Sequence, residues 1–205
     1  MDTQIKILQK AQELFMRMGI RAVSMDDIAT QAGMSKKTIY QYYADKDELV
    51  DAVMIEEEKS VHNDSRECFE LSNNAIEEIL LTLSRVYTRF SQMNPLVLFD
   101  MERFHTKAHN RFQKMKYEYL YNVIQTNIKR GMKEGLYRKE LNVDVITRYR
   151  LESIMIPFNM NVYPPSKFSL AEVTKELMEH FLIGLSTLKG HELILQYKEQ
   201  KLEKA

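Results

Sequence analysis

The sequence contains few residues that break helices or cross-link a chain. Its 205 residues include six glycines, four prolines, one cysteine and no tryptophan, and the first proline is Pro95. Because glycine and proline are the least favourable residues inside a helix, their scarcity over so long a stretch predicts an all-α fold. The single cysteine, Cys68, excludes an intramolecular disulfide framework and a cysteine zinc cluster, and is typical of proteins from a reducing cytosol.

An excess of charge and a long apolar run are also missing. The 29 lysines and arginines balance the 29 aspartates and glutamates, so no global field attracts nucleic acid or a membrane surface. Charged residues interrupt the apolar pattern of the N-terminus, unlike that of a signal peptide, and no run approaches the roughly 18 apolar residues of a membrane span. We therefore expect a cytoplasmic protein without a membrane partner.

The N-terminal part of the sequence predicts a helix-turn-helix unit. Apolar residues recur at helical spacing over residues 7–18. Ser24, Ser35 and Asp45 then provide three helix N-caps in close succession, each preceded by an apolar residue. Gly33 supplies a tight turn between the two short helices, because glycine adopts the left-handed conformation without a Cβ clash. A helix followed by two short helices about a glycine turn is typical of a DNA-binding helix-turn-helix.

The remaining sequence predicts a bundle of longer helices. Residues 51–80 carry nine acidic residues against two basic ones, whereas residues 103–133 carry eight basic residues against one acidic residue. Stretches of opposite charge and equal size suggest that these two helical regions are neighbours. Further helices are expected over residues 143–158, 169–190 and 191–201, because apolar residues recur there at helical spacing.

Residues 7–54 combine helix caps, a turn and core positions in one pattern. The elements are the helix into Gly19, the segment Ser24-Met25-Asp26-Asp27-Ile28-Ala29, the turn Ala32-Gly33-Met34-Ser35, the segment Thr38-Ile39-Tyr40, and Tyr43, Lys46 and Leu49. This pattern resembles, almost position for position, the N-terminal domain of TetR-family transcriptional regulators. Residues 131–138 resemble the end of the long central helix in the same family.

The resemblance implies a three-helix head that binds operator DNA and an all-helical C-terminal domain that dimerises and holds a small effector. We accordingly predict a helix-turn-helix DNA-binding domain over residues 1–48. An effector-binding and dimerisation domain is predicted over residues 49–205. The predicted function is a ligand-responsive repressor whose partners are double-stranded operator DNA, a small-molecule effector and a second copy of the chain.

Helical phase assigns the DNA-contacting face of the third predicted helix. At 100° per residue, core contacts by Ile39 and Tyr43 turn Gln41 to the far side, where its amide can reach base edges in the major groove. Lys37 and Thr38 share that face. The full set of predicted DNA contacts is Ser24, Ser35, Lys36, Lys37, Thr38, Tyr40, Gln41, Tyr42 and Lys46.

Some of these residues also have a purely structural interpretation. Ser24 and Ser35 are helix caps first, and a phosphate contact would be secondary. Lys36 is explained equally well as a solvated lysine or as a phosphate contact. Tyr40 and Lys46 are assigned to phosphates by the resemblance to the family.

Aromatic and methionine residues in the middle of the chain are candidates for an effector cavity, because such side chains adapt to apolar ligands. Ordinary core packing is the competing interpretation for each of them. The predicted effector-binding residues are Tyr87, Phe90, Met101, Phe104, His105, Phe112, Met115 and Tyr119. Two strongly apolar helices near the C-terminus predict a dimer interface that includes Ile146, Tyr149, Met155, Phe158, Leu177, Phe181, Leu185 and Leu188.

Two alternative functions remain open from the sequence. Glu102 and His105 have the Glu-x-x-His spacing of di-iron helical bundles, which would make the chain a metalloenzyme. Such a site needs a second copy of the motif, and the sequence has none, so we expect no enzyme activity, no metal and no cofactor. The other alternative is a protein-interaction adaptor that keeps the head fold without binding DNA.

Overall fold

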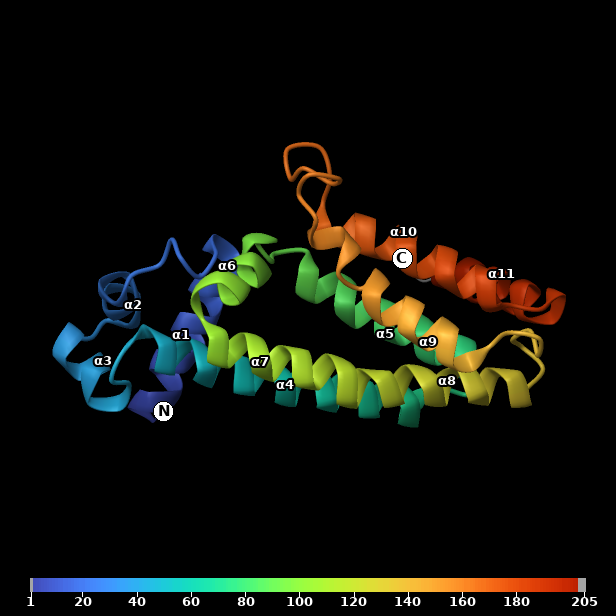
Figure 1. Cartoon of the computed structure of the whole chain (residues 1–205), viewed down its shortest axis with the longest axis horizontal. Coiled ribbons are helices and arrows are strands. Elements are labelled where there is room, and N and C mark those ends of the chain that lie inside the picture. The colour runs from blue at the N-terminus through green and yellow to red at the C-terminus, as the bar shows by residue number, and fades with distance from the viewer. Residues whose placement is uncertain (1, 203–205) are drawn as a thin grey trace. The chain divides into compact units, whose positions relative to one another are not determined.

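The protein is helical throughout the part of the chain that its structure, a computed structural model, describes, which is residues 2–202 (Figure 1). No β-strand forms within these residues, which confirms the all-α prediction. No helix in the same range combines the length and the apolar character that a bilayer span requires. The chain forms two compact units, one containing residues up to Val61 together with Phe90–Met115, and the other containing His62–Arg89 and the residues from Lys116 onward.

The first unit begins with the three helices of the predicted head, α1 (Thr3–Met18), α2 (Met25–Ala32) and α3 (Lys36–Tyr42). It also contains the start of α4 (Lys46–Leu71), with α6 (Leu96–Phe104) and α7 (Thr106–Lys114). All of these helices contribute to a single hydrophobic core. Fully buried members of that core include Ile7, Phe15, Ile28, Ile39, Leu49, Val97 and Met101. The first unit therefore extends beyond residues 1–48, because α4, α6 and α7 complete the core of the head.

Local capping fixes the helices of the head as the sequence predicts. The Ser24 hydroxyl accepts a hydrogen bond from the Asp27 amide at 3.1 Å, and the Asp27 carboxylate accepts one from the Ser24 amide at 2.8 Å. This reciprocal pair is the predicted capping box, and it satisfies two otherwise unpaired helix donors. Gly33 has a φ of 66°, the left-handed conformation expected of the turn. Ser35 caps α3 by accepting from the Thr38 amide at 3.1 Å.

The acidic and basic stretches meet in the first unit as expected. The Asp51 carboxylate in α4 lies 2.9 Å from the Lys107 ammonium group and 3.1 Å from Nε of Arg111 in α7. Arg111 also reaches Glu58, at 3.6 Å. These pairs confirm that the two oppositely charged regions are neighbours.

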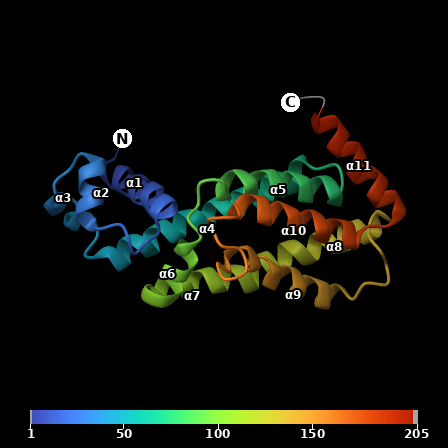
Figure 2. The same ribbon diagram turned by 90° about the horizontal axis from the view of Figure 1, so that it is seen from above.

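The second unit is built from the end of α4 and the helices that follow. Its elements are α5 (Ala75–Phe90), the π-helical turn η1 (Met115–Leu120), α8 (Tyr121–Lys133), α9 (Val143–Ser153), the short 3₁₀ turn η2 (Ile156–Phe158), α10 (Leu170–Leu185) and α11 (Leu188–Leu202). Figure 2 shows α8 and α9 running along one another in this unit. Its core includes Ile76, Ile128, Tyr137, Leu182 and Leu185.

Two predicted helix ends are wrong, for different reasons. The helix expected over residues 143–158 ends at Ser153, because Pro157 follows closely and proline cannot continue a helix. The helix expected over residues 169–190 ends at Leu185 instead. The carbonyl of Leu185, the last residue of this helix, accepts a hydrogen bond from the Arg138 amide at 2.9 Å. This bond holds the chain in a non-helical conformation before α11 begins.

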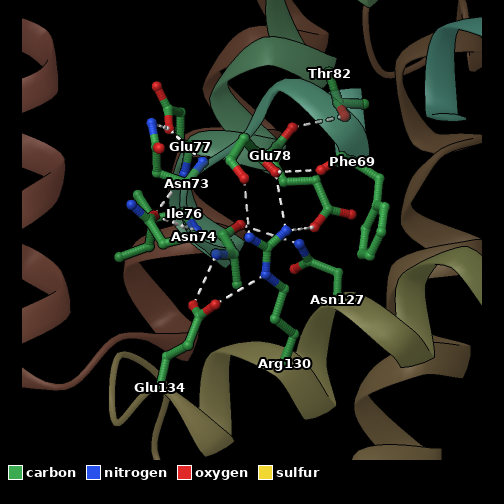
Figure 3. Close-up of polar contacts among 12 residues, drawn as sticks. Phe69, Asn73, Asn74, Ile76, Glu77, Glu78, Thr82, Asn127, Arg130 and Glu134 are labelled. Carbon is green, nitrogen blue, oxygen red and sulfur yellow. Dashed lines mark hydrogen bonds and ion pairs between the residues drawn. The ribbon is translucent and has the colours of Figure 1, made fainter. Parts of the chain in front are cut away.

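A polar network fastens α8 to the corner between α4 and α5 (Figure 3). The Arg130 guanidinium donates to the Glu78 carboxylate at 3.0 Å, to the Ser72 carbonyl at 3.0 Å and to the Glu134 carboxylate at 2.8 Å. Glu134 in turn accepts from the Ala75 amide at 2.8 Å. Because Glu78 is buried, Arg130 provides the positive charge that its carboxylate needs.

Candidate functional site

The predicted DNA-contacting residues all lie in the first unit. Ile39 and Tyr43 are buried, as the helical phase requires, and Lys37 and Gln41 are exposed on the rest of α3. Tyr40 is also exposed. The remaining members divide into the exposed Ser24, Ser35, Lys36 and Tyr42 and the partly exposed Thr38 and Lys46. Every residue of the predicted set therefore keeps some surface from which it can reach DNA.

Two of the predicted lysines have partners inside the protein. The Lys36 ammonium group lies 2.9 Å from the Asp26 carboxylate, and this hydrogen bond raises the pKa of Lys36. Lys46 lies over the Phe15 ring at 5.8 Å, and burial lowers its pKa. A phosphate contact by Lys36 would have to compete with Asp26, whereas Lys46 has no carboxylate within ion-pair distance in the described part of the chain.

The effector-binding residues predicted in the first unit have several different environments. Met101 is completely buried in the core that also holds α3, and Phe112 packs against the same core. Phe104 is exposed, with the Arg21 guanidinium 5.1 Å from its ring centroid. Phe90 and Met115, the last residue of α5 and the first of η1, also belong to this unit, because the boundary between the units falls within those elements. Core packing accounts for Met101 fully, so the burial of this residue is not by itself a sign of a ligand.

His105 is held by the first helical turn of α4. Its Nδ1 atom lies 2.5 Å from the Asp47 carboxylate, and the imidazole is buried. Glu102, its partner in the metalloenzyme alternative, is exposed. Within residues 2–202 no group of three or more histidine, cysteine or acidic residues could hold a metal ion. The described geometry thus gives the metalloenzyme alternative no support.

Tyr87 and Tyr119 are the predicted effector-binding residues in the second unit. The Tyr87 hydroxyl donates to the Glu172 carboxylate at 2.6 Å, which joins α5 to α10. Tyr119, in the π-helical turn η1, lies against His62, with the ring centroids 3.7 Å apart. The Nε2 atom of His62 is inaccessible to solvent and has no hydrogen-bond partner. No pattern in the sequence shows that the ring nitrogen of His62 lacks a partner.

The residues predicted at the dimer interface divide into two groups. Phe181 and Leu185 are buried within the protomer, where they contribute to the core of the second unit. Part of the apolar stripe on α10 therefore covers the protein's own core. Tyr149 and Leu188 are exposed, and the partly exposed members are Ile146, Met155, Phe158 and Leu177. Ile183, which sequence reasoning missed, adds an exposed apolar side chain on α10.

The sequence of the head matches a known family. Residues 7–53 fit the profile described as bacterial regulatory proteins of the tetR family. Residues 7–53 thus have the sequence of a TetR-family head. This match confirms, for the head, the resemblance seen in the sequence.

Individual relatives agree with this match. The chain is 31% identical over 106 residues to the uncharacterised HTH-type transcriptional regulator YvaF of Bacillus subtilis strain 168, a match that covers 50% of this chain and 54%, about half, of YvaF. It is 23% identical over 189 residues to the HTH-type transcriptional repressor KstR2 of Rhodococcus jostii strain RHA1, covering 89% of this chain and 90% of KstR2. The fold is similar to that of Bacillus subtilis FadR, solved in complex with stearoyl-CoA, with a TM-score of 0.64, 16% identity and coverage of 88% and 98% of the two chains.

Proposed function

We propose that this chain is a TetR-family homodimeric repressor that binds operator DNA through α3 and is released by a small-molecule effector. The observation that carries this proposal is the division of α3 into a buried face, with Ile39, and an exposed face, with Lys37 and Gln41. The exposed side chains have the donors and acceptors that read base edges in the major groove. The relative KstR2 is named a repressor, which supports repression rather than activation.

Effector control would act by shifting the population of two conformations. A ligand that binds one conformation more tightly favours it, and release follows if the spacing of the two heads then differs from half-sites about 34 to 36 Å apart. The capture of stearoyl-CoA by FadR supports a small-molecule site in this fold. Within the present chain, the unpartnered Nε2 atom of His62 beside Tyr119 is a candidate effector contact, because a buried polar atom without a partner is costly.

Substitutions on and beside α3 test the DNA-binding part of the proposal. Changing Lys37 or Gln41 to alanine should cost about 1 to 3 kcal/mol on the best operator and much less on non-specific DNA, because base contacts carry the sequence preference. Lys46→Ala should weaken all duplexes alike and reduce the salt dependence of log affinity by about one unit of slope, because phosphate contacts do not read sequence. Fluorescence anisotropy on matched and scrambled duplexes at several salt concentrations would measure both effects.

Lys59 provides a matched control for these substitutions. It is an exposed lysine on α4, paired with Glu56 at 2.7 Å, so Lys59→Ala should leave operator affinity unchanged. A change of sequence preference in Lys46→Ala, with preference intact in the Lys37 and Gln41 variants, would show that the proposed orientation of α3 is wrong.

The exposed face of α10 provides the test of the homodimer. Ile183→Glu should convert the dimer to a monomer at micromolar concentration in sedimentation experiments, because it places a charge in an apolar contact. Operator affinity should fall by about 100-fold or more, since a monomer can engage only one half-site at a time. Leu71→Glu is the control, because Leu71 is equally apolar and exposed at the end of α4. A wild-type monomer at this concentration would refute the homodimer.

A further inference from the structure

The second unit encloses a histidine nitrogen that has no hydrogen-bond partner. Among the described side chains that are not exposed, His62 alone has a solvent-inaccessible nitrogen or oxygen atom without such a partner, and that atom is Nε2. His62 lies on the part of α4 that belongs to the second unit. Because the atom is enclosed within one protomer, a second copy of the chain cannot supply the missing partner. A buried polar atom left unpaired destabilises the fold, so its presence calls for a functional reason.

A tyrosine that is only partly buried lies across this imidazole. The ring centroids of His62 and Tyr119 are 3.7 Å apart, and the ring planes are tilted by 40°. The Tyr119 hydroxyl donates to the backbone carbonyl of His62 at 3.4 Å, which is long compared with the usual distance of about 2.7 to 2.8 Å for such a bond. Because this bond is weak and the side chain is partly exposed, Tyr119 can rotate outward and uncover one face of the imidazole.

Tyr119 also lies in the one π-helical turn found among residues 2–202. This turn, η1, interrupts an otherwise α-helical segment between α7 and α8. Single π-helical turns of this kind are rare and occur frequently at functional sites. Lys116 in the same turn is buried and pairs with Glu152 of α9 at 3.1 Å. The backbone that carries Tyr119 is therefore held in place, whereas the Tyr119 ring is free to move.

The charged residues close to His62 are already paired or solvated. Residues three and four positions away are its neighbours on the surface of α4. The contacts of the charged neighbours are Glu58 with Arg111 at 3.6 Å, Lys59 with Glu56 at 2.7 Å, and the exposed Arg66 with Asn63 at 3.3 Å. Glu118, which precedes Tyr119 in η1, is exposed. None of these groups offers an enclosed charge to an ionic ligand, so the surroundings of Nε2 favour an uncharged ligand.

We propose that the effector is an uncharged aromatic compound with a hydroxyl group, which enters beside Tyr119 and forms a hydrogen bond with Nε2 of His62. In a neutral imidazole Nε2 is a donor in one tautomer and an acceptor in the other, and a hydroxyl group can bond with either. The adjoining rings of His62 and Tyr119 suit an aromatic body, because aromatic rings pack favourably on one another. This assignment rests on the proposed function, in which the chain binds a small-molecule effector, and it names the chemical class of that effector.

The test compares wild type with His62→Phe and with a matched control, His109→Phe. His109 is also partly exposed, but its Nε2 atom has a partner, the Gln113 side-chain amide at 2.9 Å. The probe is 4-methylphenol, with toluene as the counterpart that lacks the hydroxyl group and 4-methylbenzoate as the charged counterpart. Calorimetric titration and operator binding are measured for each protein with each compound, and thermal unfolding is measured without any compound.

The phenol should bind wild type and His109→Phe about 10-fold more tightly than toluene, because one net hydrogen bond changes affinity by about that factor. It should also weaken their operator binding, whereas 4-methylbenzoate should have neither effect. In His62→Phe the phenol should lose both its advantage over toluene and its effect on operator binding. Without any compound, the Tm of His62→Phe should exceed that of wild type by about 2 to 4 °C, because the unpartnered nitrogen is gone, and His109→Phe should show no such gain.

The outcomes distinguish this proposal from the function on which it rests. Equal affinity of wild type for the phenol and toluene, or an undiminished preference for the phenol in His62→Phe, would overturn the hydroxyl site. A Tm of His62→Phe no higher than that of His109→Phe would also overturn it, because Nε2 would then have a partner. Binding of the phenol through His62 with no change in operator affinity would overturn its assignment as an effector. Failure of wild type to bind operator without any compound would instead refute the proposed function.

Discussion

Replacing Arg130 by methionine should lower the free energy of unfolding by about 3 to 5 kcal/mol, because it leaves the Glu78 carboxylate buried without its counter-ion. Glu78 is only 5% exposed, and Arg130 is the one cation that its carboxylate contacts among the described residues. The substitution also removes the hydrogen bond to the Ser72 carbonyl. Urea denaturation at a fixed protein concentration would measure the loss, with the concentration fixed because dimerisation contributes to apparent stability.

The pH dependence of this loss identifies its cause. Burial raises the pKa of Glu78, whereas hydrogen bonds from Asn127 and Arg130 oppose that rise. An acid whose pKa is raised on folding contributes stability below its unfolded pKa, and that stability is lost as the pH rises through the folded pKa. Without Arg130 the pKa should rise further, so the loss should be larger at about pH 7.5 than at about pH 5.

Two further variants separate charge from packing. Glu78→Gln should restore part of the stability that Arg130→Met loses, because it removes the unpaired charge. Arg148→Met, which breaks the exposed pair with Asp144, should cost at most about 1 kcal/mol. An equal loss at both pH values, with no recovery in the double variant, would mean that packing rather than charge dominates at Arg130.

Features of the fold set by short-range interactions could be predicted from the sequence. Ser24 and Ser35 cap their helices through contacts three residues away, so their role follows from local spacing alone. The end of α10 at Leu185, in contrast, is not set by local spacing. It depends on a hydrogen bond between Arg138 and Leu185, which are far apart in sequence. No local pattern signals that contact, whereas Gly190, which sequence reasoning took as the end, is a plausible stop signal.

The candidate sites likewise include features that local spacing predicts and features that only the three-dimensional structure shows. The exposed face of α3 follows from the 100° step between helical residues once Ile39 is placed in the core. An apolar stripe such as that of α10 does not reveal whether it faces the protein's own core or a partner, so the sequence could not show that Leu185 lies in the core of its own protomer. The missing hydrogen-bond partner of His62 could not be predicted, because it is a property of the three-dimensional surroundings.

Gly131 illustrates a sequence feature whose physical reason only the structure reveals. It belongs to residues 131–138, the segment that resembles the end of the central helix in TetR-family regulators. The Tyr137 ring packs directly against its backbone, and a Cβ atom at residue 131 would lie 2.1 Å from Cδ2 of that ring. The ring is completely buried, and its hydroxyl donates to the Ala75 carbonyl at 3.1 Å. Glycine is therefore required at this position so that the returning chain can close over α8.

Gly131→Ala should consequently lower the free energy of unfolding by about 3 to 5 kcal/mol, comparable to the loss of a buried aromatic side chain, because the Tyr137 ring has to leave its position. The added methyl group is small, so most of the expected loss of stability comes from displacing the Tyr137 ring. In a Tyr137→Leu background the same Gly131→Ala change should cost much less, and this non-additivity would appear in a double-mutant cycle. Gly184→Ala is the matched control, because Gly184 is also helical but has open space at its Cβ position, and alanine there should gain about 0.5 to 1 kcal/mol. Equal losses from Gly131→Ala in both backgrounds would show that the contact with Tyr137 is not what excludes a side chain at residue 131.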